Sequence, residues 1–121
     1  MLYAEDNPVN VLLMEALVEL RPGIDLAVAG DGAAALDLAL REPPDLLLLD
    51  QHLPDLSGVD LLRRLRAQPA LEGVPAVMVS ADAMPEDRAR ALAAGCDDYW
   101  TKPLDVDATL ARLDRLLGLV D

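Results

Sequence analysis

The sequence predicts an α/β fold in which five parallel strands form a sheet with helices on both faces. Five short apolar runs alternate with five segments of helical spacing, and no repeat or low-complexity linker interrupts them. Such alternation with short connections favours right-handed crossovers and a three-layer sandwich. A chain of 121 residues that is 53% apolar can bury one core. We therefore expect residues 1–121 to form a single domain.

The apolar runs are the expected strands. The third contains four consecutive leucines, Leu46 to Leu49, with no polar residue between them. Strands with this pattern are covered on both faces, as in a parallel sheet. The first run is short and begins at the first residue, so we expect the domain to be a fragment of a longer protein. The expected strands cover residues 1–4, 25–29, 45–49, 75–80 and 98–101.

Capping residues and prolines mark the expected helices. Pro8 and Pro85 fit the first turns of the first and fourth helices. The first helix should end near residue 20 and the second at Arg41, because proline follows both ends. Gly95 lies where a left-handed helix end favours glycine. Four residues can cap helices with a side-chain oxygen, namely Asn7, Asp31, Ser57 and Asp105. In the third helix, helical spacing directs three arginines to solvent: Arg63, Arg64 and Arg66.

The composition restricts the classes of partner. The chain has 22 acidic and 10 basic residues, a net charge of −12, which disfavours nucleic acid and anionic lipid. Cations, or proteins with basic patches, are better matched. Cys96 is the one cysteine, so no internal disulfide can form, and we expect it to pack in the core. No apolar run approaches the ~20 residues that span a bilayer. We expect a cytoplasmic domain, although its parent protein can be membrane-anchored.

Reactive side chains follow the carboxyl ends of the expected strands, where open parallel sheets bind ligands. Glu5 and Asp6 follow the first strand, and Asp50 follows the third. In a flavodoxin-like strand order of 2-1-3-4-5, these two strands are neighbours, so the three acids should meet at the switch point. Ser80 ends the fourth strand and Lys102 follows the fifth. The prediction depends on all five side chains reaching the same edge.

This set of side chains suits a magnesium site and phosphoryl transfer. Three close carboxylates repel one another unless a cation lies between them. Mg²⁺ binds one or two carboxylates and keeps several waters, which leaves a position for a phosphate oxygen. Lys102 and Ser80 can then contact other phosphate oxygens, with a carboxylate as the nucleophile.

Several segments resemble the receiver domain of bacterial response regulators, the CheY-like family, over essentially the whole chain. The opening EDNPVN is most similar to receivers of hybrid sensor histidine kinases. The resemblance implies a phosphoacceptor domain of a two-component phosphorelay, which is a signalling domain and not an enzyme beyond slow autodephosphorylation. The matching segments are 2–10 (LYAEDNPVN), 45–50 (DLLLLD), 53–58 (LPDLSG), 79–81 (VSA) and 97–103 (DDYWTKP).

The resemblance also implies a role for each residue at the acidic edge. Asp50 would accept the phosphoryl group from a phosphohistidine. Asp6 and Asp50 would bind Mg²⁺ or Mn²⁺ directly, together with the backbone carbonyl of His52. Glu5 would act on the ion through a water molecule. The position of His52 is one of two that tune the lifetime of the phosphoryl group in this family. Asp82 holds the other position, so the lifetime stays open.

A second group of residues would form the switch. Ser80, Ala81 and Lys102 would contact the phosphoryl group, and Ser80 would move toward it. Tyr99 matches an aromatic residue that swings inward when the hydroxyl residue moves. Pro103 matches a proline that often follows a cis peptide bond. Trp100 is next to Tyr99 on a strand, so it should point to the opposite face and pack there.

The resemblance implies a histidine kinase or a histidine phosphotransfer protein as partner. Such a partner docks on the first helix, to which Val11, Met14 and Leu17 can contribute, although most of these residues must belong to the core. Neither nucleic acid nor membrane contact is expected of this domain, and dimerisation is left open. One alternative is a receiver-like interaction module without phosphorylation, although no site residue is missing. Another is a haloacid-dehalogenase-type phosphatase. That class needs an acid two residues after the nucleophile, where this chain has His52, and usually a cap domain, for which there is no room.

Overall fold

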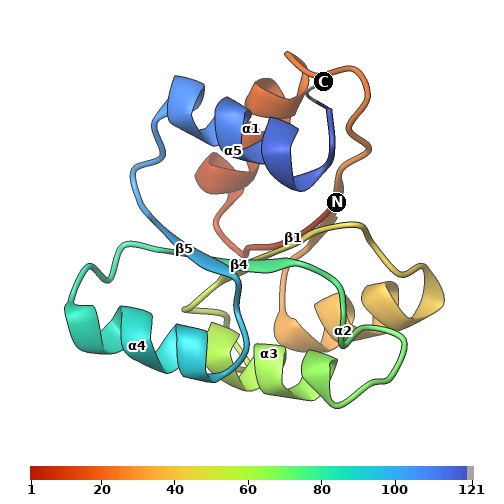
Figure 1. The fold of residues 1–121 in the computed structure, drawn as a ribbon, viewed down its shortest axis with the longest axis vertical. Helices are drawn as coiled ribbons and strands as arrows, with labels where there is room; N and C mark the ends of the chain where they lie inside the picture. Colours follow the sequence, from red (N-terminus) through yellow and green to blue (C-terminus); the bar gives the residue numbers. More distant parts are fainter. Residues whose placement is uncertain (120–121) are drawn as a thin grey trace.

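Five parallel strands form one sheet in the computed structural model, which describes residues 1–119. The order is β2-β1-β3-β4-β5, which confirms the predicted fold class (Figure 1). Every strand overlaps its predicted run, and β2 is two residues shorter than expected. The strands are β1 (Leu2–Ala4), β2 (Ala27–Ala29), β3 (Leu47–Asp50), β4 (Ala76–Ser80) and β5 (Asp98–Thr101).

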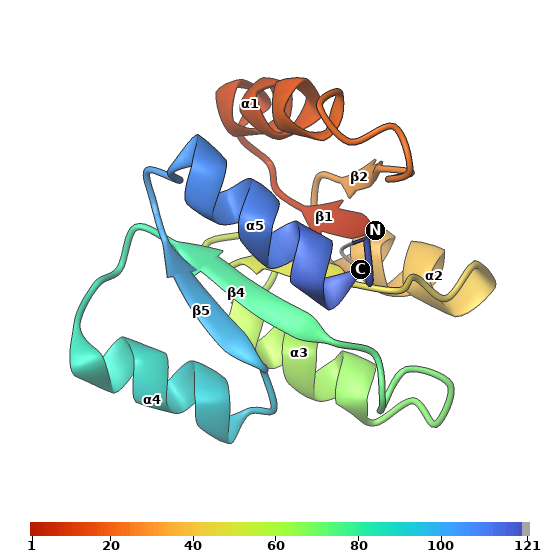
Figure 2. The same ribbon diagram turned by 45° about the horizontal axis from the view of Figure 1, so that its top comes forward.

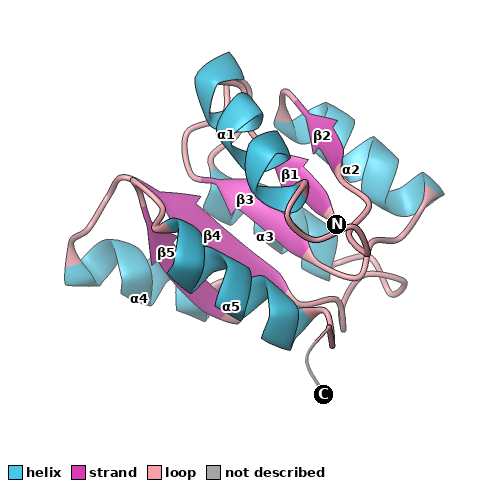
Figure 3. Ribbon diagram, turned by 90° about the horizontal axis from the view of Figure 1, so that it is seen from above, coloured by secondary structure: helices cyan, strands magenta, loops and turns pink. Residues whose placement is uncertain are grey.

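Helices cover both faces of the sheet. α1 (Pro8–Val18) and α5 (Val106–Leu116) lie together on one face. The other face carries α2 (Gly32–Arg41), α3 (Gly58–Arg66) and α4 (Pro85–Ala93). Figures 1 and 2 show these two helical layers with the sheet between them. Seen from above, α1 lies over β1 and β3, and α5 lies over β4 and β5 (Figure 3). No helix within residues 1–119 combines the length and the apolar character needed to cross a membrane.

The helix ends follow the expected chemistry. Each predicted capping side chain accepts a hydrogen bond from a backbone N–H of its helix, at 2.7–3.1 Å. α4 begins at Pro85 without a side-chain cap. Gly95 follows α4 with φ of 110°, a conformation that glycine adopts without steric cost. These caps satisfy backbone donors that the first turn of a helix leaves unpaired.

Alternate residues of the strands supply two hydrophobic cores. Leu47 and Leu49 of β3 pack with α2 and α3, while Leu46 and Leu48 pack with α1 and α5. All four are fully buried, and each such side chain contributes about 1.5–3 kcal/mol through removal from water. Unbroken apolar strands therefore hold the sheet between two layers of helices. The carboxyl edge of the sheet stays available for polar groups.

Arg66 shows that the prediction of three exposed arginines on α3 was wrong at one position. Its side chain is only 18% exposed. The guanidinium donates to the carbonyl oxygens of Val74 at 2.6 Å, Leu71 at 3.0 Å and Gly95 at 3.0 Å. A long cationic side chain at the end of a helix thus ties the loop before β4 to the loop before β5. Helical spacing alone cannot reveal such loop carbonyls.

Candidate functional site

Three acidic side chains meet at the carboxyl edge of β1 and β3. Ala4 is paired with Leu49 in the sheet, so Glu5 and Asp50 stand on adjacent strands at the same level. Carboxylate oxygens of Glu5, Asp6 and Asp50 all lie within 4.8 Å of one another. Glu5 is 2% exposed and Asp50 is 5% exposed, whereas Asp6 faces solvent. The structure thus gathers the three acids that the sequence placed at this edge.

Lys102 supplies the positive charge at this edge. Its Nζ lies 2.7 Å from Oε1 of Glu5 and 3.3 Å from Oδ1 of Asp50. The backbone N–H of Lys102 donates to the carbonyl of Ser80 at 2.8 Å, which fixes the end of β5 beside β4. The peptide bond between Lys102 and Pro103 is cis. One ammonium group therefore faces three carboxylates.

Burial and hydrogen bonding shift the pKa values of the two buried acids in opposite directions. Burial, reinforced by the adjacent Glu5 carboxylate, raises the pKa of Asp50 from 3.8 to about 6, although Lys102 opposes the change. Burial also acts to raise the pKa of Glu5. Hydrogen bonds from Lys102 and Asp50 outweigh it and hold that pKa below its ordinary value. Of the pair, Asp50 is the carboxyl group that binds a proton first as the pH falls.

Glu5 is held by two further donors that the sequence analysis did not identify. The hydroxyl of Tyr3 donates to Oε1 at 3.1 Å, and the N–H of Asn7 donates to Oε2 at 3.4 Å. Burial and the nearby carboxylates raise the pKa of Tyr3 far above its ordinary value, so the phenol keeps its proton. A signal for this contact was present, because residues two apart on a strand share a face.

The hydroxyl residue Ser80 and the aromatic residue Tyr99 both contact the backbone of Asp82. Oγ of Ser80 accepts the N–H of Asp82 at 3.1 Å, and the Tyr99 hydroxyl donates to the Asp82 carbonyl at 2.6 Å. Ser80 is fully buried and Tyr99 is 7% exposed, while Ala81 faces solvent. The ring of Tyr99 therefore already lies inward in this structure. Trp100 packs on the opposite face of the sheet, as predicted.

The side chain of His52 contacts Asp82 rather than the three clustered acids. Its Nε2 is 2.7 Å from Oδ2 of Asp82, and the imidazole is 69% exposed. This contact joins the loop after β3 to the loop after β4. The exposed imidazole therefore takes part in a contact between these two loops. From the sequence, we expected only the backbone carbonyl of His52 to bind an ion.

The loop after Asp50 is anchored to α3 by a residue that the sequence analysis passed over. The carbonyl of Gln51 accepts the N–H of Gly58 at 2.9 Å, and its side-chain Oε1 accepts the N–H of Val59 at 3.1 Å. A Cβ atom on Gly58 would lie 2.5 Å from the carbonyl oxygen of Asp50. Only glycine permits this close approach of α3 to the end of β3.

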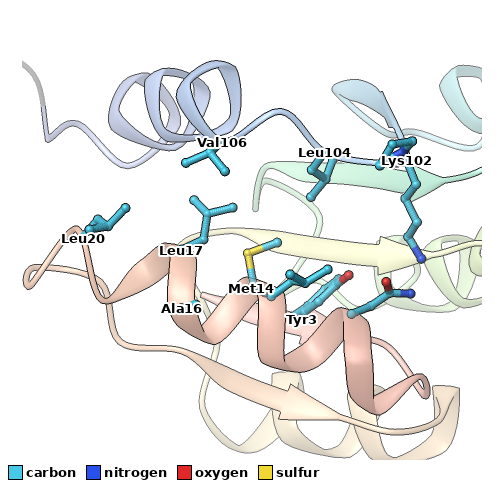
Figure 4. A pocket seen from close by; sticks show the side chains of 11 residues that line it. Tyr3, Met14, Ala16, Leu17, Leu20, Lys102, Leu104 and Val106 are labelled. Atoms are coloured by element: carbon cyan, nitrogen blue, oxygen red, sulfur yellow. The ribbon is translucent and has the colours of Figure 1, made fainter.

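An apolar groove of about 300 Å³ opens between α1 and the start of α5, next to the acidic site. Lys102 lies at one end of the groove and Leu20 at the other, with Tyr3 and Met14 between them (Figure 4). Beyond this groove, α1 exposes apolar side chains at Val9 and Leu12, each more than 60% accessible. The groove and this exposed helix face form one apolar surface beside the acids.

The family is decided by a match over nearly the whole chain. Residues 1–114 match the model of the response regulator receiver domain. The chain belongs to the response regulator receiver domain family. This places it among the receiver domains of two-component signalling, and its sheet order is that of the CheY-like fold.

The curated relatives differ in how much of their own length this chain covers. The probable transcriptional regulatory protein TcrX of Mycobacterium tuberculosis is 38% identical over 116 residues, 96% of this chain but 48% of TcrX. This chain therefore spans about half the length of that relative. The polar-differentiation response regulator DivK of Brucella anthropi is 34% identical over 97% of this chain and 94% of its own length.

Among solved structures, a similar one is the receiver domain of the sensor histidine kinase PA1611 from Pseudomonas aeruginosa. It is 36% identical, covers 97% of this chain and 95% of its own, and superposes with a TM-score of 0.87. That crystal structure has a magnesium ion coordinated in the active-site cleft.

Proposed function

We propose that this receiver domain accepts a phosphoryl group on Asp50 from a phosphohistidine of a histidine kinase or a histidine phosphotransfer protein. The observation that carries the proposal is the position of Asp50. It is buried at the carboxyl end of the central strand β3, with two acids within 4.8 Å and Lys102 at 3.3 Å. Such a carboxylate has a nucleophilic oxygen and the charged neighbours that phosphoryl transfer requires.

The donor set fits a magnesium ion. All three acids offer oxygen ligands, and solvent reaches the cluster at Asp6. Asp6, Asp50 and the backbone carbonyl of His52 would bind the ion directly. Glu5, whose oxygens already accept hydrogen bonds, would act through a water molecule. When bound, the ion neutralises the acids and the phosphoryl oxygens. Mn²⁺ suits the same ligands, and the magnesium ion in the PA1611 receiver supports this site.

In the transfer step, an Asp50 carboxylate oxygen forms a bond to phosphorus as the phosphorus–nitrogen bond of the donor histidine breaks. The bonding electron pair stays with the imidazole nitrogen. Lys102 can turn its ammonium from Asp50 toward a phosphoryl oxygen, because the two groups are only 3.3 Å apart. Ser80 and Ala81 at the end of β4 contact the remaining oxygens. The domain performs one transfer and slow autodephosphorylation, without turnover of small phosphate esters.

Asp82 gives the switch a structural basis. The Ser80 hydroxyl accepts the N–H of Asp82 and keeps its own proton free to donate, so a movement of Ser80 toward the phosphoryl group would also displace the Asp82 backbone. The inward ring of Tyr99 bonds the carbonyl of the same residue, so movement of this loop reaches both side chains. Phosphorylation then favours one packing of the face formed by α4, β5 and α5. Addition of beryllofluoride with magnesium should shift the amide signals of Ser80 and Tyr99, and unchanged signals would contradict this mechanism.

The apolar surface of α1 is the docking site that we propose for the phosphodonor. α1 is apolar around most of its circumference, although it lies on the outside of the molecule. Met14 and Leu17 are buried, in line with the expectation that most of these residues belong to the core, and they line the groove. Val9, Leu12 and Leu13 are exposed.

We place the domain in the cytoplasm as one module of a longer protein, with its output on another domain or protein.

Chemical phosphorylation tests the acceptor. The domain would be incubated with acetyl phosphate and Mg²⁺, and the acyl phosphate would then be trapped by borohydride reduction and located by mass spectrometry. We expect label at Asp50 and none in Asp50→Asn. Asp45→Asn changes an exposed acid at the start of the β3 segment and should be labelled like the wild type. Label retained in Asp50→Asn would place the acceptor elsewhere. Rapid hydrolysis of p-nitrophenyl phosphate would instead favour a phosphatase.

A further inference from the structure

Tyr3 places a phenolic hydroxyl behind the acidic cluster. The residue lies in β1, in register with Val28 of β2 and Leu48 of β3, and only 1% of its surface is exposed. Its hydroxyl donates to Oε1 of Glu5 at 3.1 Å. The same oxygen accepts Nζ of Lys102 at 2.7 Å. The Glu5 carboxylate is therefore oriented by one donor from its own strand and one from the end of β5.

We propose that Tyr3 is a positioning residue of the magnesium site, acting through Glu5. The inference rests on the proposed function, because it needs the acidic cluster to bind the ion. Glu5 is a buried carboxylate on a side chain with three rotatable bonds, so hydrogen bonds decide where its oxygens point. Hydrogen-bonded partners of metal-site carboxylates commonly set the affinity for the ion, since they fix the orientation of the ligand.

The hydroxyl of Tyr3 contacts Glu5 without also contacting Asp50, whereas Lys102 contacts both acids. Lys102 also contacts Asp50, and its ammonium is the group that turns toward a phosphoryl oxygen. Each such turn weakens its hold on Glu5. Tyr3 is buried in the central part of the sheet and has no contact with Asp50, so its hydrogen bond to Glu5 can persist while Lys102 changes partner. We infer that Tyr3 keeps Glu5 in place in the loaded state of the site.

Packing alone explains the ring of Tyr3 but not the partner of its hydroxyl. Phenylalanine would fill the same space in the core under α1 and α5, and buried tyrosine hydroxyls usually find some acceptor. Here the acceptor is a buried carboxylate of the site and not a backbone carbonyl. Removal of the donor would leave Glu5 buried with its charge less well compensated, which is costly and allows the side chain to reorient.

Calorimetric titration with MgCl₂ tests the proposal on the Tyr3→Phe variant. We expect Mg²⁺ affinity to fall about tenfold, the lower end of the range for groups that orient metal ligands. Thr109→Val is the matched control. It also deletes a buried hydroxyl, and Oγ1 of Thr109 has no hydrogen-bond partner in the described part of the chain. Its Mg²⁺ affinity should equal that of the wild type. Urea unfolding of each variant verifies that the fold is intact.

A double-mutant cycle with Glu5→Gln separates a role through Glu5 from any other role. Tyr3→Phe should weaken Mg²⁺ binding in the wild-type background and have little effect when Glu5 is already replaced. An equal loss in both backgrounds would overturn the proposal, as would wild-type affinity in Tyr3→Phe. A wild-type domain that does not bind Mg²⁺ would overturn the proposed function as well, so the two failures are distinguishable.

Discussion

Replacement of Asp50 by asparagine should stabilise the domain in the absence of divalent ions. The Asp50 side chain is 8% exposed and shares its pocket with the Glu5 carboxylate. In the folded state its pKa is raised from 3.8 to about 6, mainly by burial and then by Glu5. At neutral pH the wild type therefore keeps a carboxylate charged in surroundings that favour the neutral form. Asparagine is nearly isosteric and carries no charge.

The size of the expected stabilisation follows from the difference between the ordinary pKa of Asp50, 3.8, and its folded value of about 6. Each pKa unit corresponds to about 1.4 kcal/mol, so ionisation of Asp50 at neutral pH costs about 3 kcal/mol of folding free energy. Asparagine also loses the attraction of Lys102, although Lys102 keeps its closer contact with Glu5. A net stabilisation of about 2 kcal/mol is expected, and it should raise Tm by about 8 °C in a domain of this size.

The pH dependence distinguishes this cause from a change in packing. Because the folded pKa is raised, the contribution of Asp50 to stability is fully present below about pH 4 and is lost as the pH rises through about 6. Urea unfolding followed by circular dichroism, in EDTA, should show equal stabilities of wild type and Asp50→Asn at pH 4. The gap should open between pH 4 and 7. A variant less stable than the wild type at pH 7, or a gap independent of pH, would refute the reasoning.

Three further predictions concern the surroundings of the acids. Gly58→Ala should lower the free energy of unfolding by at least about 2 kcal/mol in urea titrations, because its Cβ would lie 2.5 Å from the Asp50 carbonyl oxygen and 2.7 Å from Sδ of Met78; Gly73→Ala, where the added carbon meets nothing within 4 Å, is the control. Arg66→Met should cost about 2–4 kcal/mol, since loop carbonyls lose their donor, and Arg63→Met should cost much less; equal effects would contradict the loop role. Millimolar Mg²⁺ should raise the Tm of the wild type but hardly that of Asp50→Asn, measured by differential scanning fluorimetry.

Backbone architecture was accessible from the sequence because local signals agreed with one another. Asn7 and Asp31 correctly indicated where two helices begin, and Gly95 indicated where one ends. The uninterrupted leucines before Asp50 required a strand covered on both faces, which placed its carboxyl end at the ligand-binding edge. The meeting of three acids and Lys102 followed from strand order alone. Positions along the chain therefore sufficed to locate the site.

The side-chain network could not be predicted, because it depends on which groups face each other across loops. Arg66 has the helical position of a solvent-exposed residue, yet its length allows it to reach carbonyls of two distant loops. Gln51 follows Asp50 directly, and nothing in its spacing indicates that its amide contacts the start of α3. The sequence also left the outward face of α1 open. An apolar helix has no polar stripe that marks its exposed side, so exposed Leu12 and buried Met14 could not be told apart.

The charge imbalance at the acidic edge links stability to function. One ammonium cannot compensate three carboxylates, and the pKa of Asp50 is raised first by burial and then by the Glu5 carboxylate. A divalent ion would relieve the same repulsion that asparagine at position 50 removes. The stabilisation by Asp50→Asn without metal and the stabilisation of the wild type by saturating Mg²⁺ therefore have a common origin. It follows that Mg²⁺ and Asp50→Asn should not be additive: together they should stabilise the domain by much less than the sum of their separate effects.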